Sequence, residues 1–348
     1  MFEYSSAQYD EQYRAIKQWV TKSFSPVHNP KAYILGGQPG AGKTSLQYLI
    51  QKQNRNVIVI NADAYRKFHP YFFEIQRKYE KGSPKYTQPF INQVTEQLVN
   101  ELSTEKYNLI VEGTLRTAAV PLNTCQTLKA KGYRVELHVI AVKRVLSYES
   151  TLLRYEIAIR QGEIPRATAK AHHDMVADAI VNNLNAIEDA GTFDAIKLFN
   201  RNGDCLYPAV GCSSAADVEN KVLNGWWTLD ETEQLEEIVA AVTDLKAARN
   251  AEDFTAYKEN SKKAIAFAEN NKYHYIKVNR EQAERLCREG ISVEGSTAKN
   301  EINVIRIPPT QIAKATQVLS QNSRKKKGGG QIVHLHFNSC LYWYQATL

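Results

Sequence analysis

One motif, GQPGAGKT at residues 37–44, constrains the fold of this chain more than any other feature. It matches the pattern GxxxxGK[ST] in full, follows a short apolar run at residues 32–35, and leads into a helical pattern that begins at Thr44. Glycines in such a loop let backbone N–H groups turn towards phosphate oxygens, and the N-terminus of the helix adds positive potential. The sequence therefore predicts a phosphate-binding loop between a buried strand and a helix.

The loop gives its side chains expected tasks. We expect Lys43 to reach the β- and γ-phosphates of ATP or GTP, and Thr44 to ligate Mg²⁺. The predicted nucleotide-binding residues are Gly37, Gln38, Pro39, Gly40, Ala41, Gly42, Lys43, Thr44 and Ser45. A nucleoside triphosphate and magnesium are thus the first two ligands that the sequence predicts.

Apolar runs alternate with helical patterns over the first two thirds of the chain. Strand-like runs follow the loop at residues 56–61, 107–113, 134–142 and 195–207, the last with a turn. Helical patterns cover residues 7–24, 87–103, 121–131, 146–161 and 167–190. Such alternation is typical of a parallel α/β sheet flanked by helices. We therefore expect a P-loop NTPase-type α/β domain over residues 1–210.

A smaller α+β region is expected over residues 211–348. Residues 230–270 are mainly helical in pattern and rich in alanine and glutamate, and residues 273–307 contain short strand-like pieces. Residues 324–330 form a basic, glycine-rich segment, RKKKGGG, of low complexity. This region contains no recognisable chemical motif, so the sequence leaves its role open.

Composition excludes several classes of protein. Hydrophobic residues make up 43% and charged residues 23%, which is ordinary for a globular protein and excludes a disordered one. The formal net charge of +7 suits an anionic partner without selecting one. Five cysteines without a CxxC pair predict neither a disulfide framework nor a zinc ribbon. Because no apolar run approaches the ~18 residues of a membrane span, we expect a cytoplasmic protein with no membrane partner.

Asp63 is the candidate general base. It lies in NADAYR at residues 61–66, just past the second apolar run, and the carboxyl ends of parallel strands face the ligand crevice. A carboxylate there could accept a proton from a substrate hydroxyl. The alternative is that Asp63 is the N-cap of the following helix, and the two roles are compatible.

Glu112 ends the third apolar run, in LIVEGTLRT, where P-loop proteins carry an acidic residue near the metal or the attacking group. We expect it to orient Mg²⁺, water or substrate. The alternative, an idle surface glutamate, is weak because an unpaired carboxylate is costly to bury after four apolar residues. Thr114 and Arg116 lie in the same exit from the strand and could bind an anionic substrate.

Arg154 and Arg166 flank a break between two helical patterns. Arginines in such places can neutralise the charge that develops on a transferred phosphoryl group. Exposed helix arginines are the alternative. His172 and His173 follow, but adjacent helical residues point to different faces, so a structural role is expected for them and not a metal site.

Several segments in order resemble the zeta toxin family, over roughly residues 10–207. They are GGQPGAGKTSL, NADAYRKFHPYF, TEQL, YNLIVEGTLRT, AVPLNTCQTLKAKGY, SYESTLLRYE, PRATAKAHHD and LFNRNGDCLY. P-loops are common, but EGTxRT, RYE and RAT in this order are not. Members of the family are P-loop kinases of toxin–antitoxin systems, which phosphorylate a hydroxyl of UDP-N-acetylglucosamine and so block cell-wall precursor synthesis.

The resemblance implies roles for the phosphate-handling residues. Lys43 and Thr44 would serve the nucleotide and the metal, and Asp63 would be the general base for the sugar hydroxyl. Arg154 and Arg166 would clamp the ATP phosphates in the transition state. A small helical antitoxin that covers the nucleotide site is the implied partner.

The resemblance also implies a substrate site. Glu96 and Glu112 would hold the UDP-sugar, with Thr114 and Arg116 nearby. Leu115 departs from the small residue often found in EGTxRT, which bears on sugar specificity. The chain beyond about residue 210 lies outside the likeness.

Two other functions remain open beside the leading hypothesis of an ATP-dependent UDP-N-acetylglucosamine kinase. One is a P-loop kinase for another nucleotide-type acceptor, such as a different UDP-sugar or NAD. The other is a nucleic-acid-stimulated P-loop ATPase, which the basic charge and the lysine-rich segment favour only weakly. Nucleic acid is therefore not the expected partner.

Overall fold

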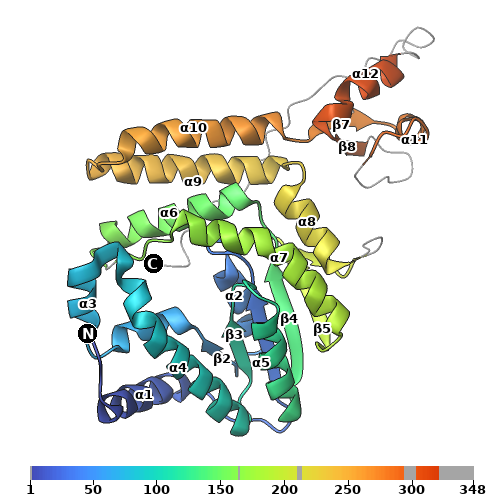
Figure 1. Ribbon diagram of the computed structural model, residues 1–348. Coiled ribbons are helices and arrows are strands. Elements are labelled where there is room, and N and C mark those ends of the chain that lie inside the picture. Colours follow the sequence, from blue (N-terminus) through green and yellow to red (C-terminus); the bar gives the residue numbers. More distant parts are fainter. Residues whose placement is uncertain (1, 164, 210–213, 294–302, 321–348) are drawn as a thin grey trace. The chain divides into compact units, whose positions relative to one another are not determined.

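The protein forms two compact units, which are described separately. The computed structural model describes residues 2–163, 165–209, 214–293 and 303–320 (Figure 1). The first unit comprises Met1–Gly225 and Ala241–Asn250, and the second comprises Trp226–Ala240 and Ala251–Leu348. The first unit thus extends past residue 210, the domain end expected from the sequence. The basic segment at residues 324–330 lies outside the described residues.

A six-stranded sheet of order β2-β3-β1-β4-β5-β6 is the centre of the first unit. Its strands are β1 (Lys31–Gly36), β2 (Ile58–Ile60), β3 (Leu109–Glu112), β4 (Arg134–Ile140), β5 (Ala195–Phe199) and β6 (Cys205–Tyr207). Neighbouring strands from β2 to β5 are parallel, and β6 runs antiparallel to β5. The predicted α/β fold with a mostly parallel sheet is confirmed. The expected final strand and turn is a short hairpin.

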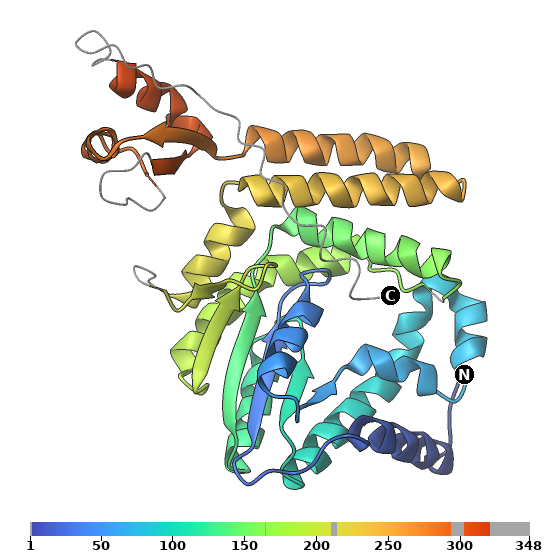
Figure 2. The same cartoon turned by 180° about the vertical axis from the view of Figure 1, so that it is seen from behind.

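Helices cover both faces of this sheet. The helices of the first unit include α1 (Ser6–Thr21), α2 (Lys43–Gln53), α3 (Phe72–Tyr79), α4 (Ser83–Thr104), α5 (Ala119–Ala130), α6 (Arg144–Arg160), α7 (Lys170–Ala190) and α8 (Ala215–Asn224). Both α2 and α5 contact β1 and β4; α5 covers the face seen in Figure 1, and α2 the face seen in Figure 2. Strands covered on both faces need apolar residues throughout, which is why β4 is buried at every position after Arg134.

Local sequence signals explain where several helices begin. In α1, Ser5 and Gln8 form a capping box, and Tyr13, Ile16 and Val20 turn their side chains into the core at helical spacing. Helix α4 begins at Ser83, four residues before the predicted start at Thr87, with a proline in its first turn where the missing N–H costs little. Helices α3 and α8 were not predicted.

The second unit contains most of α9 (Leu229–Ala248), then α10 (Phe254–Asn270), β7 (His274–Val278), α11 (Arg280–Arg288), β8 (Asn303–Ile307) and α12 (Ile312–Ser320). Strands β7 and β8 pair antiparallel, with Ile276 opposite Ile305 in a small apolar core that α11 and α12 complete. Helix α11 was not predicted between the two strand-like pieces. Within the described part of the whole chain, no helix is long and apolar enough to span a membrane.

Candidate active site

The phosphate-binding loop connects the carboxyl end of β1 to α2, which begins at Lys43. Gly40 and Gly42 have φ angles of 76° and 108°, which side-chain-bearing residues rarely adopt. A Cβ atom at Gly40 would also collide with the backbone carbonyl of Ser147 on α6. The glycines therefore let the loop turn tightly and lie directly against α6.

Lys43 lies over the loop that it follows. Its Nζ donates hydrogen bonds to the carbonyl oxygens of Gly37, at 2.7 Å, and Gln38, at 3.3 Å. The pKa of Lys43 is lowered to about 8, chiefly by burial; the nearby charges of Arg154 and Arg166 act in the same direction, and Glu112 opposes them. The lysine is therefore surrounded by positive charge with little solvent to stabilise its own, which favours a bound anion. Thr44, next in the chain, is exposed to solvent.

Glu112 ends β3 beside the loop, opposite Leu35 of β1 in the parallel ladder. Its carboxylate accepts a hydrogen bond from Nε2 of Gln47 on α2. Burial raises the pKa of Glu112, against the opposing effects of Lys43 and Arg154. The structure thus brings an acidic group to the position next to the lysine that the sequence predicted.

Asp63 lies in a 3-10 helix, Ala62–Phe68, directly after β2. The side chain of Asn61 accepts the N–H of Asp63, at 3.0 Å, and is the N-cap of this helix. The alternative that Asp63 is the N-cap is therefore wrong, because Asn61 already fills that position. The Asp63 carboxylate is 44% exposed and forms ion pairs with Nε of Arg66, at 3.0 Å, and with the guanidinium of Arg166.

Arg66 fixes the position of the Asp63 side chain by pairing with its Oδ1 atom. It is buried, and it donates to the carbonyl oxygen of Pro84, at 2.9 Å, and to the side chains of Thr87 and Gln88 on α4, at 2.6 and 2.7 Å. Because every branch of this guanidinium is engaged, Arg66 gives the partly exposed Asp63 carboxylate a rigid support at one oxygen, while Arg166 pairs with the other oxygen.

The two arginines approach the site from the α6–α7 region. Arg166, in the connection between these helices, pairs with Asp63, as stated above. Arg154, on α6, donates from Nη2 to the hydroxyl of Thr168 at 3.5 Å, and its pKa is lowered by burial with Glu112 opposing. Lys43, Asp63, Glu112, Arg154 and Arg166, which we call the strand-end cluster, therefore gather around the loop.

The predicted substrate residues differ in how close they come to this cluster. Thr114 is half-buried just beyond β3, and Arg116 is exposed. The pKa of His172 is lowered by burial and then by Arg116 and Arg166, which places these two arginines near the same ring. Among the described contacts, Glu96 does not join the cluster; it is exposed on α4, about 12 Å along the helix axis from Gln88 and about 80° around it.

Leu115, the departure from the family pattern, belongs to the core. It has a φ angle of 55°, and its side chain is only 3% exposed. A Cβ atom on Gly36 would collide with that side chain, so the leucine fills the space beside β1. Leu115 is therefore accommodated in the core beside Gly36, and its side chain does not line the surface around Thr114 and Arg116.

Sequence reasoning missed Arg201, in the turn between β5 and β6. Its guanidinium donates to the carbonyl oxygens of Gly40, at 2.5 Å, and Ala41, at 3.2 Å, and to the hydroxyl of Ser150 on α6, at 2.9 Å. It thereby ties the phosphate-binding loop to α6. Its only signal was its place in LFNRNGDCLY, where an arginine in a polar turn resembles an ordinary surface residue.

Gln38 makes a second connection between the loop and α6. Its buried Nε2 donates to the carbonyl of Val142, at 3.0 Å, and to the hydroxyl of Ser147, at 3.3 Å. Ser147 is also 2.8 Å from Nε2 of the buried His173 on α7. His173 thus has a partner in the scaffold, which agrees with the structural role expected for it.

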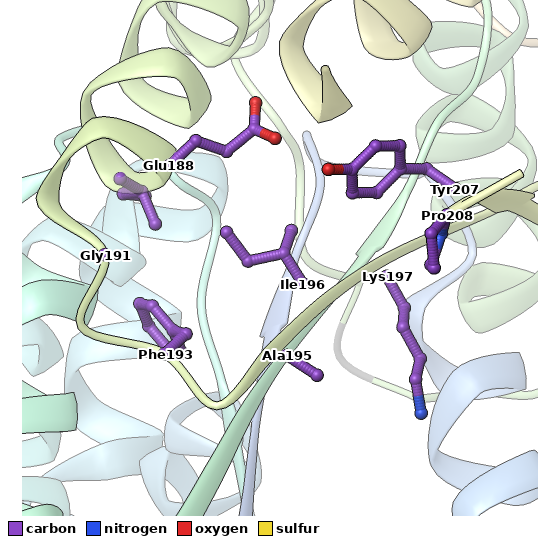
Figure 3. Close-up of a pocket in the computed structure, with 9 residues that line it drawn as sticks. Glu188, Gly191, Phe193, Ala195, Ile196, Lys197, Tyr207 and Pro208 are labelled. Carbon is purple, nitrogen blue, oxygen red and sulfur yellow. The ribbon is translucent and has the colours of Figure 1, made fainter. Parts of the chain in front are cut away.

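A pocket of about 360 Å³ lies elsewhere, beside β5 and β6 (Figure 3). Its polar lining is already engaged: the Glu188 carboxylate accepts the N–H groups of Ala215 and Ala216 at the start of α8, and Lys197 bonds Glu136 at 2.9 Å. No residue of the strand-end cluster lines it. This pocket is therefore separate from the strand-end cluster.

The loop, the acidic residues at the ends of neighbouring strands and the converging arginines define the class of P-loop kinases. The family model described as Zeta toxin matches residues 16–210. The chain belongs to the zeta toxin family, and the resemblance predicted from its motifs is confirmed. Family membership identifies a toxin with kinase-type activity.

Named relatives agree with this assignment. Toxin PezT of Streptococcus pneumoniae is 42% identical over 220 residues, which are 62% of this chain and 87% of that protein. Toxin zeta of Streptococcus pyogenes is 41% identical over 195 residues, 56% of this chain and 68% of that protein. A solved structure from the PezAT chromosomal toxin–antitoxin system of Streptococcus pneumoniae superposes with a TM-score of 0.63 at 35% identity, covering 70% of this chain and 98% of that one.

Proposed function

We propose that this protein transfers the γ-phosphate of ATP to a hydroxyl of UDP-N-acetylglucosamine, and that this reaction makes it toxic by blocking cell-wall precursor synthesis. The observation that carries the proposal is the strand-end cluster, in which one lysine, two arginines and two carboxylates meet at the phosphate-binding loop. Membership in the zeta toxin family supports the same reaction.

On the donor side, the loop backbone and Lys43 would hold the triphosphate. The Thr44 hydroxyl and the Glu112 carboxylate are hard oxygen ligands, which fit Mg²⁺, an ion usually bound by few protein groups together with phosphate and water. The described residues contain no group of three or more His, Cys, Asp or Glu side chains that could hold a metal without a nucleotide. A bound Mg²⁺ would supply positive charge at the phosphates.

On the acceptor side, Asp63 would accept the proton of the sugar hydroxyl. The hydroxyl oxygen forms a bond to the γ-phosphorus while the bond from that phosphorus to the ADP oxygen breaks, which yields a sugar phosphomonoester and ADP. Asp63 suits this task because it is half exposed and is held by the buried Arg66. Arg154 and Arg166 would stabilise the charge on the phosphoryl group, since arginine stays protonated even when burial lowers its pKa.

A small helical antitoxin that covers the nucleotide site is the proposed partner. The solved relative that superposes on this chain comes from a toxin–antitoxin system. A kinase with an open phosphate site and a vital acceptor would need such a partner to stay inactive in its own cell.

Mass spectrometry of an acceptor panel tests the proposal. The purified chain is incubated with ATP, magnesium and either UDP-N-acetylglucosamine, another UDP-sugar or NAD. We expect UDP-N-acetylglucosamine to gain the mass of one phosphoryl group. Asp63→Asn should abolish this gain, while Asp178→Asn, a matched change in the exposed pair with Arg144, should not.

Other results would redirect the proposal. Phosphorylation of NAD or a different UDP-sugar in place of UDP-N-acetylglucosamine would keep the kinase and change its acceptor. Hydrolysis of ATP stimulated by single-stranded nucleic acid, without transfer to any acceptor, would contradict the kinase altogether.

A further inference from the structure

Helix α6 contacts the phosphate-binding loop along one face. Ser147, Ser150 and Arg154 are spaced i, i+3 and i+7, so they lie in one stripe along the helix. Ser147 accepts from Gln38 and Ser150 accepts from Arg201, which itself holds the loop carbonyls. The first half of α6 is thereby fixed to the loop, and Arg154 continues the same stripe into the strand-end cluster.

The opposite face of α6 carries a buried carboxylate, Glu156. Helical residues are about 100° apart, so Glu156 lies about 200° around the axis from Arg154. Its side chain is only 1% exposed. Arg249 grips it with two hydrogen bonds, Nε to Oε2 at 2.6 Å and Nη2 to Oε1 at 2.8 Å, and Nζ of Lys246 lies 3.1 Å from Oε1.

These contacts satisfy the charge of Glu156. Burial alone would raise the pKa of this carboxyl, but the hydrogen bonds from Arg249 and Lys246 outweigh burial and lower it. A two-pronged arginine contact also fixes the direction of the carboxylate, because both N–H groups point from a rigid plane. The pair of cations therefore holds α6 against rotation about its own axis.

Lys246 and Arg249 lie outside the residues 16–210 that match the family model, yet they belong to the first unit through the segment Ala241–Asn250. We propose that they are positioning residues of the phosphotransfer site: by holding Glu156, they set the rotation of α6 and with it the place of Arg154. The inference rests on the proposed role of Arg154 at the phosphoryl group. Segment 241–250 is then part of the catalytic unit.

Full-length variants test this inference. Arg249→Met should lower kcat by about 10- to 100-fold, since a misplacement of about 1 Å at a catalytic group can cost that much. The KM for ATP should change by less than about threefold, because the loop contacts of α6 remain. Arg280→Met, which breaks an exposed pair with Glu284 in the second unit, is the matched control and should leave kcat unchanged.

A second readout needs no acceptor. Amide hydrogen exchange in α6 should become faster in Arg249→Met, while exchange in β1 should stay as in the parent. If Arg249→Met does not fold, Arg249→Lys takes its place; it keeps the charge but loses the two-pronged contact, and it should lower kcat several-fold in a folded protein.

The inference fails if a folded Arg249 variant keeps the parental kcat and the parental exchange in α6, or if Arg280→Met loses as much activity. Failure of the proposed function looks different. In that case the parental chain transfers no phosphate to UDP-N-acetylglucosamine, while exchange in α6 still responds to Arg249→Met.

Discussion

Two groups of charged residues in the first unit are built from the same residue types and behave in opposite ways. The strand-end cluster contains Lys43, Asp63, Glu112, Arg154 and Arg166, and the α6–α9 cluster contains Glu156, Lys246 and Arg249. At the strand ends, burial lowers the pKa of Lys43 and raises that of Glu112, so both charged forms are disfavoured. In the α6–α9 cluster, cations lower the pKa of Glu156 and its charged form is favoured.

The difference separates a ligand site from a scaffold. Charges that the protein itself leaves poorly compensated, next to an open loop, are suited to a ligand that supplies the missing charge. Charges that are fully paired and buried hold elements in place, and they are costly to break because the remaining charge stays buried. Helix α6 belongs to both groups, with Arg154 on one face and Glu156 on the other.

The sharpest way to test this comparison is Arg154→Met. If Arg154 has its proposed role at the transferred phosphoryl group, kcat should fall by about 10³-fold or more, the range found for arginines in this role. The melting temperature should stay within about 2 °C of the parent, since among the described contacts the guanidinium donates one weak hydrogen bond, to Thr168 at 3.5 Å. Steady-state kinetics and a thermal melt measure the two effects. A large loss of stability would show that Arg154 holds the fold together, as the residues of the α6–α9 cluster do.

Arg201→Met should have the next largest effect. The variant loses the bonds to the carbonyls of Gly40 and Ala41 and so loosens the phosphate-binding loop. We expect kcat/KM for ATP to fall by about 10- to 100-fold. Arg134→Met is the control, since it removes an exposed arginine whose partner, Glu136, keeps its bond to Lys197. Equal kcat/KM in the Arg201 variant and the parent would show that the loop holds its shape without this clamp.

The pH dependence of ATP binding should show the lowered pKa of Lys43. A lysine with a pKa of about 8 loses its charge in the free protein as the pH rises from 7 to 9. ATP affinity should therefore fall by up to about tenfold over this range, since about one lysine in ten is still charged one unit above the pKa. Lys43→Arg should bind more weakly at pH 7 but lose this dependence. A parental affinity that is constant to pH 9 would contradict the assignment.

Glu219 should affect stability and leave activity unchanged. It is fully buried in α8; neither carboxylate oxygen has a hydrogen-bond partner in the described part of the chain, and burial raises its pKa to about 8. Between pH 4.5, the ordinary pKa of a glutamate, and pH 8, the unfolded chain releases a proton that the folded chain keeps, so stability falls as the pH rises.

Glu219→Gln should remove that slope, which urea unfolding at pH 5, 6.5 and 8 would measure. Glu219 differs from the carboxylates of both the strand-end cluster and the α6–α9 cluster. The pKa of Glu219 is raised, as in Glu112, but no charged neighbour contributes to the shift. Identical slopes in the variant and the parent would show that Glu219 is not the protonated group.

Much of the fold and of the site follows from local signals. The glycines of residues 37–44 predict the loop, and the apolar runs predict the five parallel strands, because strands covered on both faces need such runs. Asp63 and Glu112 were predictable from their places just after strands, since strand ends meet at one edge of a parallel sheet.

The rest depends on contacts between residues far apart in the chain. Arg201 resembles a surface residue until the fold brings its turn under the loop, and Lys246 and Arg249 resemble the solvated end of a helix until α6 presents Glu156. Asn61 holds the N-cap position that was the alternative role for Asp63, because the helix begins two residues earlier than that alternative required. Glu219 gave no signal, since a glutamate in a polar helical segment is normally exposed.

Transfer of label from [γ-³²P]ATP is the most direct test of the central claim that the strand-end cluster moves a phosphoryl group onto an alcohol. The purified chain is mixed with labelled ATP, magnesium and UDP-N-acetylglucosamine, and the sugar nucleotide is separated from inorganic phosphate. The account predicts label in the sugar nucleotide with the parental chain and almost none with Asp63→Asn. Label released only as inorganic phosphate, at the same rate with and without the acceptor, would contradict it.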